Sequence, residues 1–349
     1  MKEKTIPHSR PTLGEEEINA VTEVIRSGHI TQGEKVKEFE EELARFVGVK
    51  GAVATNSGTS ALHLGLLALG LGKGDGVLLP SYVCSSPLNA IYQTGVQPVL
   101  CDIELESFNI SLESIEDRRT ENTKAVIVPH MFGSPADLEK IENAGVTVVE
   151  DCAHSIGALY GDRKTGSIGS FSILSFYINK MLACGEGGAI LSNDEDMLNF
   201  ARDRRSYDEK EDYKVRYNYK MTDMQAALGL VQLKKLPEMI KKRKEIAECY
   251  TVAFADLDIV LPRSEFDNIF YRYVIKTPKD IPNAIALLRE KDVTCARPVF
   301  TPLHRYFELR SGFRNTDEAY SSALSIPIYP SLTEEEQLQV IEAVKETLG

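Results

Sequence analysis

The sequence predicts an α/β protein with a mostly parallel seven-stranded sheet flanked by helices and a smaller C-terminal α+β domain. Between residues 51 and 192, short apolar segments alternate with helical stretches. Most of these segments are apolar throughout, which is typical of strands covered on both faces. Helical connections between consecutive strands favour right-handed crossovers and therefore parallel pairing. After about residue 240 the alternation stops, which indicates a second unit.

Two helices are expected before the first strand. The first ends at Ser27-Gly28 and carries apolar residues at helical spacing, namely Ile18, Val21, Val24 and Ile25. The second ends before Gly48 and places on one face Val36, Phe39, Leu43, Phe46 and Val47. The seven predicted strands then follow as GAVAT near 51, GVLLP near 76, QPVLCDI near 97, AVIVPH near 125, VTVVED near 146, FSILSF near 171 and GAILS near 188.

The C-terminal part reads as a compact α+β unit. KLPEMIKKRKEIAECYTVAFADL predicts a long helix with a basic face, and FYRYVIKT predicts a strand. Two further helices are expected near IPNAIALLREK and TEEEQLQVIEAVKETL. We therefore expect a large domain over residues 1–240 and a small domain over residues 241–349.

Composition excludes several classes of function. The net charge of −12 argues against a nucleic-acid partner, because phosphate backbones need clustered Lys and Arg. The apolar runs are shorter than the roughly 18 residues that span a bilayer, and the first residues lack the apolar stretch of a signal peptide. We therefore expect a cytoplasmic protein without a membrane partner. The six cysteines form no C-x-x-C pair and no metal-ligand spacing, which predicts reduced thiols and no metal site.

The segment ATNSGTSALHLGLLALG is a candidate phosphate site. A strand ends at Thr55, a turn of small polar residues follows, and a helix begins near Thr59. Such a turn offers free backbone amides at the positive end of a helix dipole, and Ser57, Thr59 and Ser60 add hydroxyl groups. The alternative is an ordinary helix N-cap without a ligand.

The segment VVEDCAHSIGA places two polar residues beside a strand end. An apolar strand brings Asp151 to its carboxyl end, where open α/β sheets bind ligands. Asp151 can cap a helix, bind a metal or pair with a heterocyclic nitrogen. His154 can stack on a ligand or serve a structural role.

The segment SFSILSFYINKMLACGEGGAILS carries the most informative residue. It places Ser175 and Lys180 after one strand, and a Gly-rich loop over residues 185–188 leads into the next strand. A buried lysine in apolar surroundings can supply the neutral amine that Schiff-base chemistry requires. The alternative is a surface lysine in a turn.

Together these motifs resemble the DegT/DnrJ/EryC1/StrS family of sugar aminotransferases, which have the fold of aspartate aminotransferase. The resemblance covers nearly the whole chain. RPTLGEEEINAVTEVIRSGHITQGEKVKEFEEELARFVG is similar to the family's opening, NSGTSALHL to its phosphate turn, and EDCAHSIGA and SF-x3-K-x4-GEGG to its cofactor motifs. RYNYKMTDMQAALGLVQL and ALSIPIYPSLTEEEQ are similar to its later signatures.

The resemblance implies pyridoxal 5'-phosphate (PLP) as cofactor and assigns a role to each matching residue. Lys180 matches the lysine that forms the internal aldimine and shuttles protons, and Asp151 matches the carboxylate that pairs with the pyridinium nitrogen. His154 matches a position near the ring. The phosphate ligands implied are Ser57, Gly58, Thr59, Ser175 and, from the neighbouring subunit, Asn218. A homodimer with shared active sites follows from the last of these.

Two positions depart from the family pattern. Cys84 stands where an aromatic residue usually stacks on the cofactor ring, so we expect that face to be covered less well, or by His154 or Tyr82. Tyr177 stands where a His is common. Relatives that remove a sugar hydroxyl carry His at the position of Lys180, so the lysine favours transamination over dehydration.

The resemblance implies transfer of an amino group from L-glutamate, which becomes 2-oxoglutarate, to a nucleotide-linked 3-keto or 4-keto sugar by a ping-pong mechanism. Two alternatives stay open: a PLP-dependent lyase or desulfurase that uses Cys184 or Cys84, and a non-catalytic PLP-binding regulator. Candidate segments for sugar recognition are residues 28–33, 207–213 and 297–304.

Overall fold

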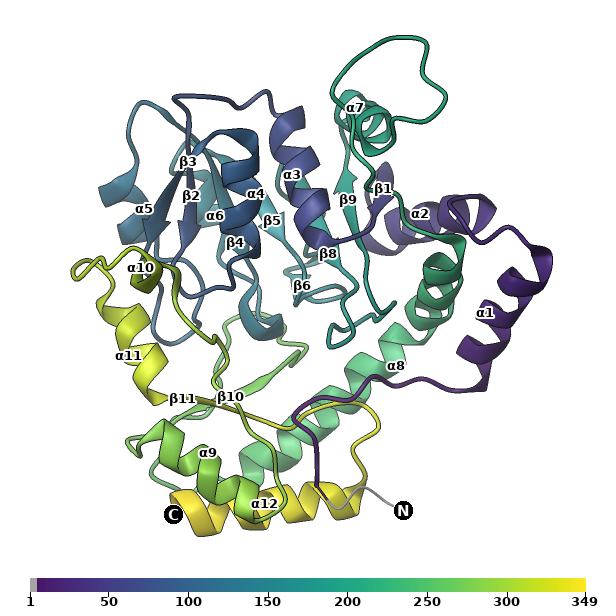
Figure 1. The fold of residues 1–349 in the computed structure, drawn as a ribbon. Helices are drawn as coiled ribbons and strands as arrows, with labels where there is room; N and C mark the ends of the chain where they lie inside the picture. Colours follow the sequence, from purple (N-terminus) through teal and green to yellow (C-terminus); the bar gives the residue numbers. More distant parts are fainter. Residues whose placement is uncertain (1–4) are drawn as a thin grey trace.

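The computed structural model describes residues 5–349, and a seven-stranded sheet forms its centre (Figure 1). The strands lie in the order β1-β9-β8-β5-β4-β2-β3, and neighbours are parallel except where β9 pairs with β1 and β8. The predicted fold class is confirmed. Each predicted segment supplies one strand: β1 (Gly51–Thr55), β2 (Gly76–Pro80), β3 (Gln97–Cys101), β4 (Thr123–Pro129), β5 (Thr147–Asp151), β8 (Phe171–Ser175) and β9 (Gly188–Ser192).

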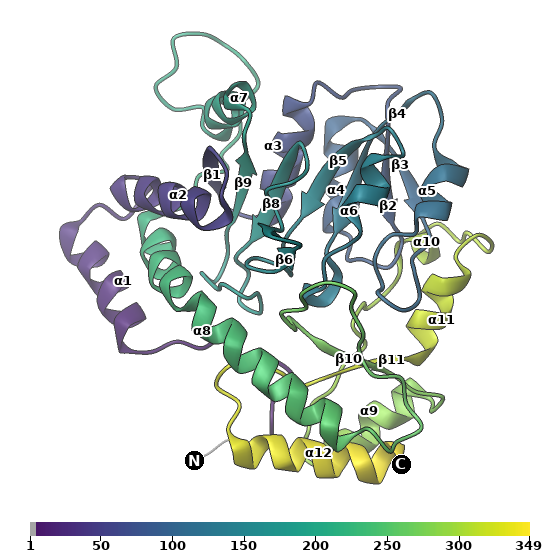
Figure 2. The same cartoon turned by 180° about the vertical axis from the view of Figure 1, so that it is seen from behind.

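Helices cover both faces of this sheet (Figures 1 and 2). One face packs against α3 (Gly58–Ala68), α4 (Ser86–Thr94) and α7 (Glu195–Arg205). The other packs against α2 (Glu34–Val47), α5 (Leu112–Arg118), α6 (Leu138–Glu142) and the first half of α8 (Asp223–Ala253). In β2, for example, Val77 and Leu79 face the first layer and Leu78 faces the second. Burial on both faces explains why the strands are apolar throughout.

The first helix, α1 (Glu15–Ser27), packs against α8, as does α2. Gly28 ends α1 in a left-handed conformation with φ 76°, and Gly48 ends α2 with φ 91°. The first residue of α8, Asp223, accepts hydrogen bonds from the amides of Gly33 at 2.7 Å and Val36 at 3.0 Å. This carboxylate therefore ties the start of α2 to the start of α8.

The helix α8 runs from the sheet to the C-terminal part of the molecule (Figure 1). Leu233 and Leu236 pack in the core beside the sheet, whereas Ile246 and Tyr250 pack in a separate C-terminal core. The change between cores lies close to residue 240. Ile6 also packs in the C-terminal core and bridges to Val293, so this part of the N-terminal arm lies with the C-terminal unit.

The C-terminal core surrounds a small antiparallel sheet of β10 (Tyr273–Lys276) and β11 (Ala323–Ile326). The helices α9 (Ile281–Glu290) and α12 (Glu334–Leu348) pack in this core. In contrast, α10 (Leu303–Tyr306) and α11 (Arg314–Ser322) bury residues in the core on the first face of the main sheet. The remaining short elements are η1 (Met131–Gly133), β6 (Leu159–Tyr160) and β7 (Arg163–Lys164). Across residues 5–349, none of the helices has both the length and the apolar character required to cross a bilayer.

Candidate active site

A cavity of 660 Å³ opens where several strands of the main sheet end. The C-terminal unit forms its other wall through Tyr271, Arg272 and residues 297–301. Eight of the nine predicted site residues line it: Ser57, Gly58, Thr59, Cys84, Asp151, His154, Ser175 and Lys180. The exception is Asn218.

The turn before α3 forms a cradle of free amide groups. Ser57 is the N-cap of the helix, and its hydroxyl oxygen accepts a hydrogen bond from the Ser60 amide at 3.1 Å. The amides of Ser57, Gly58 and Thr59 have no acceptor within residues 5–349. Ser57 is therefore an N-cap, and the turn still presents three donors at the positive end of a helix. This arrangement suits a phosphate group.

Close backbone packing sets the position of this cradle. The strand β9 begins at Gly188 between β1 and β8, where it pairs with Thr55 and Ser175. A Cβ atom on Gly188 would lie 2.4 Å from the carbonyl carbon of Ser57, so a side chain does not fit there. The Cβ of Ser175 lies 3.0 Å from the place that a Cβ on Gly58 would take. The Gly-rich loop thus allows the phosphate turn to reach Ser175.

Asp151 ends β5 with one carboxylate oxygen engaged and one free. Oδ1 accepts a hydrogen bond from the Ala153 amide at 3.0 Å, and no donor within residues 5–349 contacts Oδ2. Burial raises the pKa of Asp151, although the Ala153 amide and the positive charge of Lys180 oppose that effect. A carboxylate in this position gains from a cationic partner, such as a protonated ring nitrogen.

A buried network behind Asp151 fixes the end of β5. The carboxylate of Glu150 accepts a hydrogen bond from His130 Nε2 at 3.0 Å and three from backbone amides, those of Gly166, Ile168 and Gly169. Burial alone would raise the pKa of Glu150, but the hydrogen bond from His130 and those from the amides outweigh it and lower this pKa. Sequence reasoning missed Glu150. The feature that could have indicated it is an acidic residue inside an otherwise apolar strand.

His130, Glu150 and Cys152 lie close enough to suggest a metal site. However, His130 Nδ1 accepts a hydrogen bond from the Ala136 amide at 3.0 Å, so Nε2 carries the proton that it donates to Glu150. Both nitrogens of the imidazole are therefore in use. The cluster is better explained as a structural network.

Lys180 lies in the turn after β8, close to an aromatic residue that sequence reasoning missed. Its Nζ is 5.2 Å from the ring centroid of Tyr271. That ring stacks on His154 with the centroids 4.1 Å apart. Burial, Lys180 and Arg272 lower the pKa of His154 well below its usual value, so its imidazole is neutral.

One prediction about the cofactor ring is wrong. Tyr82 is fully buried, and its hydroxyl donates to the Ala319 carbonyl at 3.4 Å, so it does not face the cavity and cannot cover a ligand there. Cys84 does line the cavity and is exposed. Of the segments expected to recognise a sugar, residues 297–301 line this cavity, whereas residues 28–33 and 207–213 do not.

Asn218 does not line the cavity. Its neighbours Tyr217 and Tyr219 stack on each other at 4.8 Å and pack against His63, while the Asn218 side chain is exposed. Asn218 does not cap α8, because Thr222 does so in a reciprocal pair with Gln225. Its side chain is free to meet a group outside this chain.

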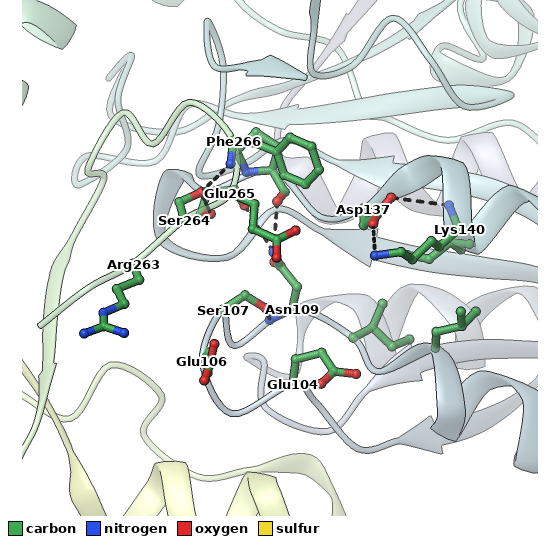
Figure 3. Close-up of a pocket in the computed structure, with 15 residues that line it drawn as sticks. Glu104, Glu106, Ser107, Asn109, Asp137, Lys140, Arg263, Ser264, Glu265 and Phe266 are labelled. Atoms are coloured by element: carbon green, nitrogen blue, oxygen red, sulfur yellow. Dashed lines mark hydrogen bonds and ion pairs between the residues drawn. The ribbon is translucent and has the colours of Figure 1, made fainter. Parts of the chain in front are cut away.

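A second cavity, of 520 Å³, lies beyond the ends of β3 and β4, against residues 263–266 (Figure 3). Its charged lining consists of four acidic residues, Glu104, Glu106, Asp137 and Glu265, and two basic ones, Lys140 and Arg263. It contains none of the predicted site residues.

The first cavity meets the requirements of PLP at three points. Three free amides and Ser175 can hold a phosphate, the unpaired oxygen of Asp151 can hold a ring N–H, and Lys180 supplies an amine for the aldehyde. When bound, PLP acts as an electron sink for the carbon that carries the amino group.

Comparisons with known proteins agree with this geometry. The model of the DegT/DnrJ/EryC1/StrS aminotransferase family matches residues 11–345. The spore coat polysaccharide biosynthesis protein SpsC of Bacillus subtilis is 36% identical over 98% of this chain and 96% of its own length. The aminotransferase TlmJ of Streptoalloteichus hindustanus superposes with a TM-score of 0.93 at 29% identity, covering 98% of each chain. Spr1654 of Streptococcus pneumoniae, solved in its PLP form, superposes with a TM-score of 0.92 at 26% identity, covering 99% of this chain and 100% of its own.

The match over almost the whole chain extends to both the sheet and the C-terminal unit. This chain therefore belongs to the DegT/DnrJ/EryC1/StrS aminotransferase family, whose members are PLP-dependent sugar aminotransferases.

Proposed function

We propose that this enzyme transfers an amino group from L-glutamate to a nucleotide-linked 3-keto or 4-keto sugar by a ping-pong mechanism through one cavity. One observation carries the proposal. Lys180, the unpaired oxygen of Asp151 and the free amides of residues 57–59 line the same cavity. These are the groups that amino transfer with PLP needs, and Lys180 is a lysine rather than the His of the related dehydratases.

Each residue then has a role that its surroundings support. Lys180 binds the cofactor covalently and, once displaced by the substrate amine, moves a proton as general acid and base. Asp151 holds the proton on the ring nitrogen. The neutral imidazole of His154 accepts or donates a hydrogen bond at the cofactor's edge without adding charge. Ser175 and the amides of residues 57–59 bind the phosphate.

The cavity wall supports a large anionic acceptor. Arg297 lines it in a chain whose net charge is −12, so this local cation offsets a general repulsion of anions. Phe300 is 86% exposed beside Tyr306 on the same wall, where an aromatic ring can stack on a nucleotide base or a sugar. A nucleotide-linked sugar carries both kinds of group.

A desulfurase is less well supported than an aminotransferase. Cys184 is buried, and burial raises its pKa, so it is a poor source of the thiolate that persulfide chemistry needs. Cys84 is exposed in the cavity, so its substitution is the informative control. Production of sulfide from L-cysteine that is lost on Cys84→Ser would favour the desulfurase.

We further propose a homodimer in which Asn218 reaches the phosphate bound by the partner subunit. Its exposed side chain and the exposed Ile18 and Ile25 on the outer face of α1 support a contact with a second copy. Mixing Lys180→Ala with Asn218→Ala subunits would leave one intact site in each hybrid dimer and restore up to about a quarter of the activity. No recovery, although hybrids form, would place Asn218 in its own subunit's site or in none.

The direct test uses the cofactor-loaded enzyme in two steps. We expect glutamate to convert it to the amine-bearing form with release of 2-oxoglutarate. A panel of 3-keto and 4-keto sugar nucleotides is then added, and mass spectrometry identifies the product that gains the amine. A visible cofactor band that no amino acid alters would favour the non-catalytic regulator.

A further inference from the structure

Arg272, which no motif singled out, lies on the cavity wall between Lys180 and the N-terminal arm. We propose that Arg272, held in place by His8, binds the α-carboxylate of the amino donor. The inference rests on the proposed aminotransferase function and deepens it, because it assigns one half-reaction to a residue of this chain. It has two parts: the location of the cation and the device that holds it.

The guanidinium lines the same cavity as the reacting lysine, and both lie near the ring of Tyr271. Arg272 Cζ is 5.1 Å from the ring centroid of Tyr271, and Lys180 Nζ is 5.2 Å from the same centroid. An α-amino acid carries its carboxylate on the carbon that bears the reacting amine. A receptor for that carboxylate must therefore line the same cavity as the lysine, as Arg272 does.

Arg272 has no counter-ion in the part of the chain that the structure describes. Within residues 5–349, no Asp, Glu or C-terminal oxygen forms an ion pair with it, although it is only partly exposed. A partly buried cation without an anion is most stable with an anionic ligand, and a guanidinium binds a carboxylate through two parallel hydrogen bonds.

His8, from the N-terminal arm, contacts the guanidinium group of Arg272. Arg272 Nη1 lies 2.9 Å from Nδ1 and 3.0 Å from Nε2 of His8, and Nε2 lies 2.8 Å from the Ser325 hydroxyl on β11. Burial and the nearby Arg272 lower the pKa of His8 to about 3, so its imidazole is neutral and can accept a hydrogen bond from the cation. His8 is thus a positioning residue that orients Arg272 without neutralising it.

The other arginine of the cavity is differently placed. Arg297 donates to the Tyr320 carbonyl, and its Cζ lies 4.3 Å from the Tyr320 ring centroid. Arg272, in contrast, lies against the ring of Tyr271, which Lys180 also approaches. Arg272 is therefore the arginine next to the chemistry, and Arg297 serves as a matched control.

The test measures two unreactive probes on cofactor-loaded protein by calorimetry: glutarate, a dicarboxylate, and a nucleoside diphosphate (UDP and dTDP). We expect Arg272→Gln to weaken glutarate binding by about ten- to a hundred-fold, the range for hydrogen bonds to a charged group, with nucleotide binding within about two-fold of wild type. In the glutamate half-reaction KM should rise by a similar factor and the limiting rate should change much less. Arg297→Gln should leave glutarate binding unchanged.

The His8 variants test the positioning role. His8→Phe should reproduce part of the Arg272→Gln loss of glutarate binding, and His8→Gln, which keeps an acceptor, should restore most of it. The inference is overturned if Arg272→Gln binds glutarate as wild type does, or if nucleotide binding weakens in its place. Failure of the proposed function gives a different result, because the wild-type enzyme itself would then accept an amino group from no amino acid.

Discussion

Two cavities of similar size open at the carboxyl edge of the sheet, and they differ in how far their polar groups are satisfied. In the cavity of Figure 3, the amide of Asn109 donates to the carbonyls of Ser134 and Pro135, and Asp137 pairs with Lys140 at 2.6 Å. In the active-site cavity, the amides of residues 57–59 and one oxygen of Asp151 lack a partner within residues 5–349. Polar groups that line a cavity without a partner, rather than the volume of the cavity, distinguish a ligand site from a surface hollow.

The largest expected difference between the two cavities concerns their lysines. Lys180→Ala should abolish amino transfer, since no other residue of its cavity offers an amine. Lys140→Ala in the second cavity removes only a surface ion pair, which contributes little to stability. Steady-state assays of both variants measure this. Measurable turnover by Lys180→Ala would show that Lys180 does not supply the reacting amine.

The carboxylates give the second contrast. Asp151→Asn should slow the glutamate half-reaction by at least about a hundred-fold, because an amide cannot hold the proton on the ring nitrogen. Asp137→Asn should leave this rate unchanged and lower only the stability, as Asp137 caps α6. Stopped-flow spectra of the cofactor follow the half-reaction. Rates within a few fold of wild type for Asp151→Asn would remove its assigned role.

Gly188 offers a smaller and purely steric test. Gly188→Ala forces a methyl group against the phosphate turn, where the added atom would lie 2.4 Å from Ser57. Overpacking of this kind costs about 1–3 kcal/mol, so we expect roughly ten-fold or more weaker PLP binding. Gly72→Ala is the control, because a Cβ there meets nothing within 4 Å. Equal cofactor affinity in both variants would contradict the close approach of β9 to the turn.

The smallest effect is on stability and depends on pH. Above about pH 6.5 the imidazole of His8 is neutral in both folded and unfolded chains, and as pH falls toward 3 only the unfolded chain binds a proton. The free energy of unfolding should therefore decrease as the pH is lowered from about 6.5 toward 3. This one group contributes at most about 1.4 kcal/mol per pH unit. His8→Gln should flatten that slope in urea unfolding. Equal slopes would show that His8 is not held neutral.

The sequence predicted the sheet and most of the cavity because both follow from local patterns. Apolar strands covered on both faces are recognisable, and the residues just after them must gather at one edge, as Asp151 and Ser175 do. Tyr271 and Arg272 directly precede β10, whose strand was predicted but whose position against the cavity depends on the packing of the C-terminal core. Their part in the site could not be inferred from spacing.

The same limit explains the error at Tyr82. Its neighbour Cys84 faces the cavity, but Tyr82 packs in the core, stacked on Phe108 at 5.8 Å. The chain between β2 and α4 is irregular, so no periodicity in the sequence indicates which side chain turns inward. Cys84 and His154 both line the cavity, so they stay the candidates for covering the cofactor ring.

The central claim is that Lys180 holds the cofactor. Borohydride reduction of the loaded enzyme, followed by proteolysis and mass spectrometry of the peptides, locates the covalent link directly. We expect the reduced cofactor on the peptide that contains Lys180, and no adduct on Lys140. An adduct on a different lysine, or a loaded and active enzyme that borohydride does not label, would contradict the account.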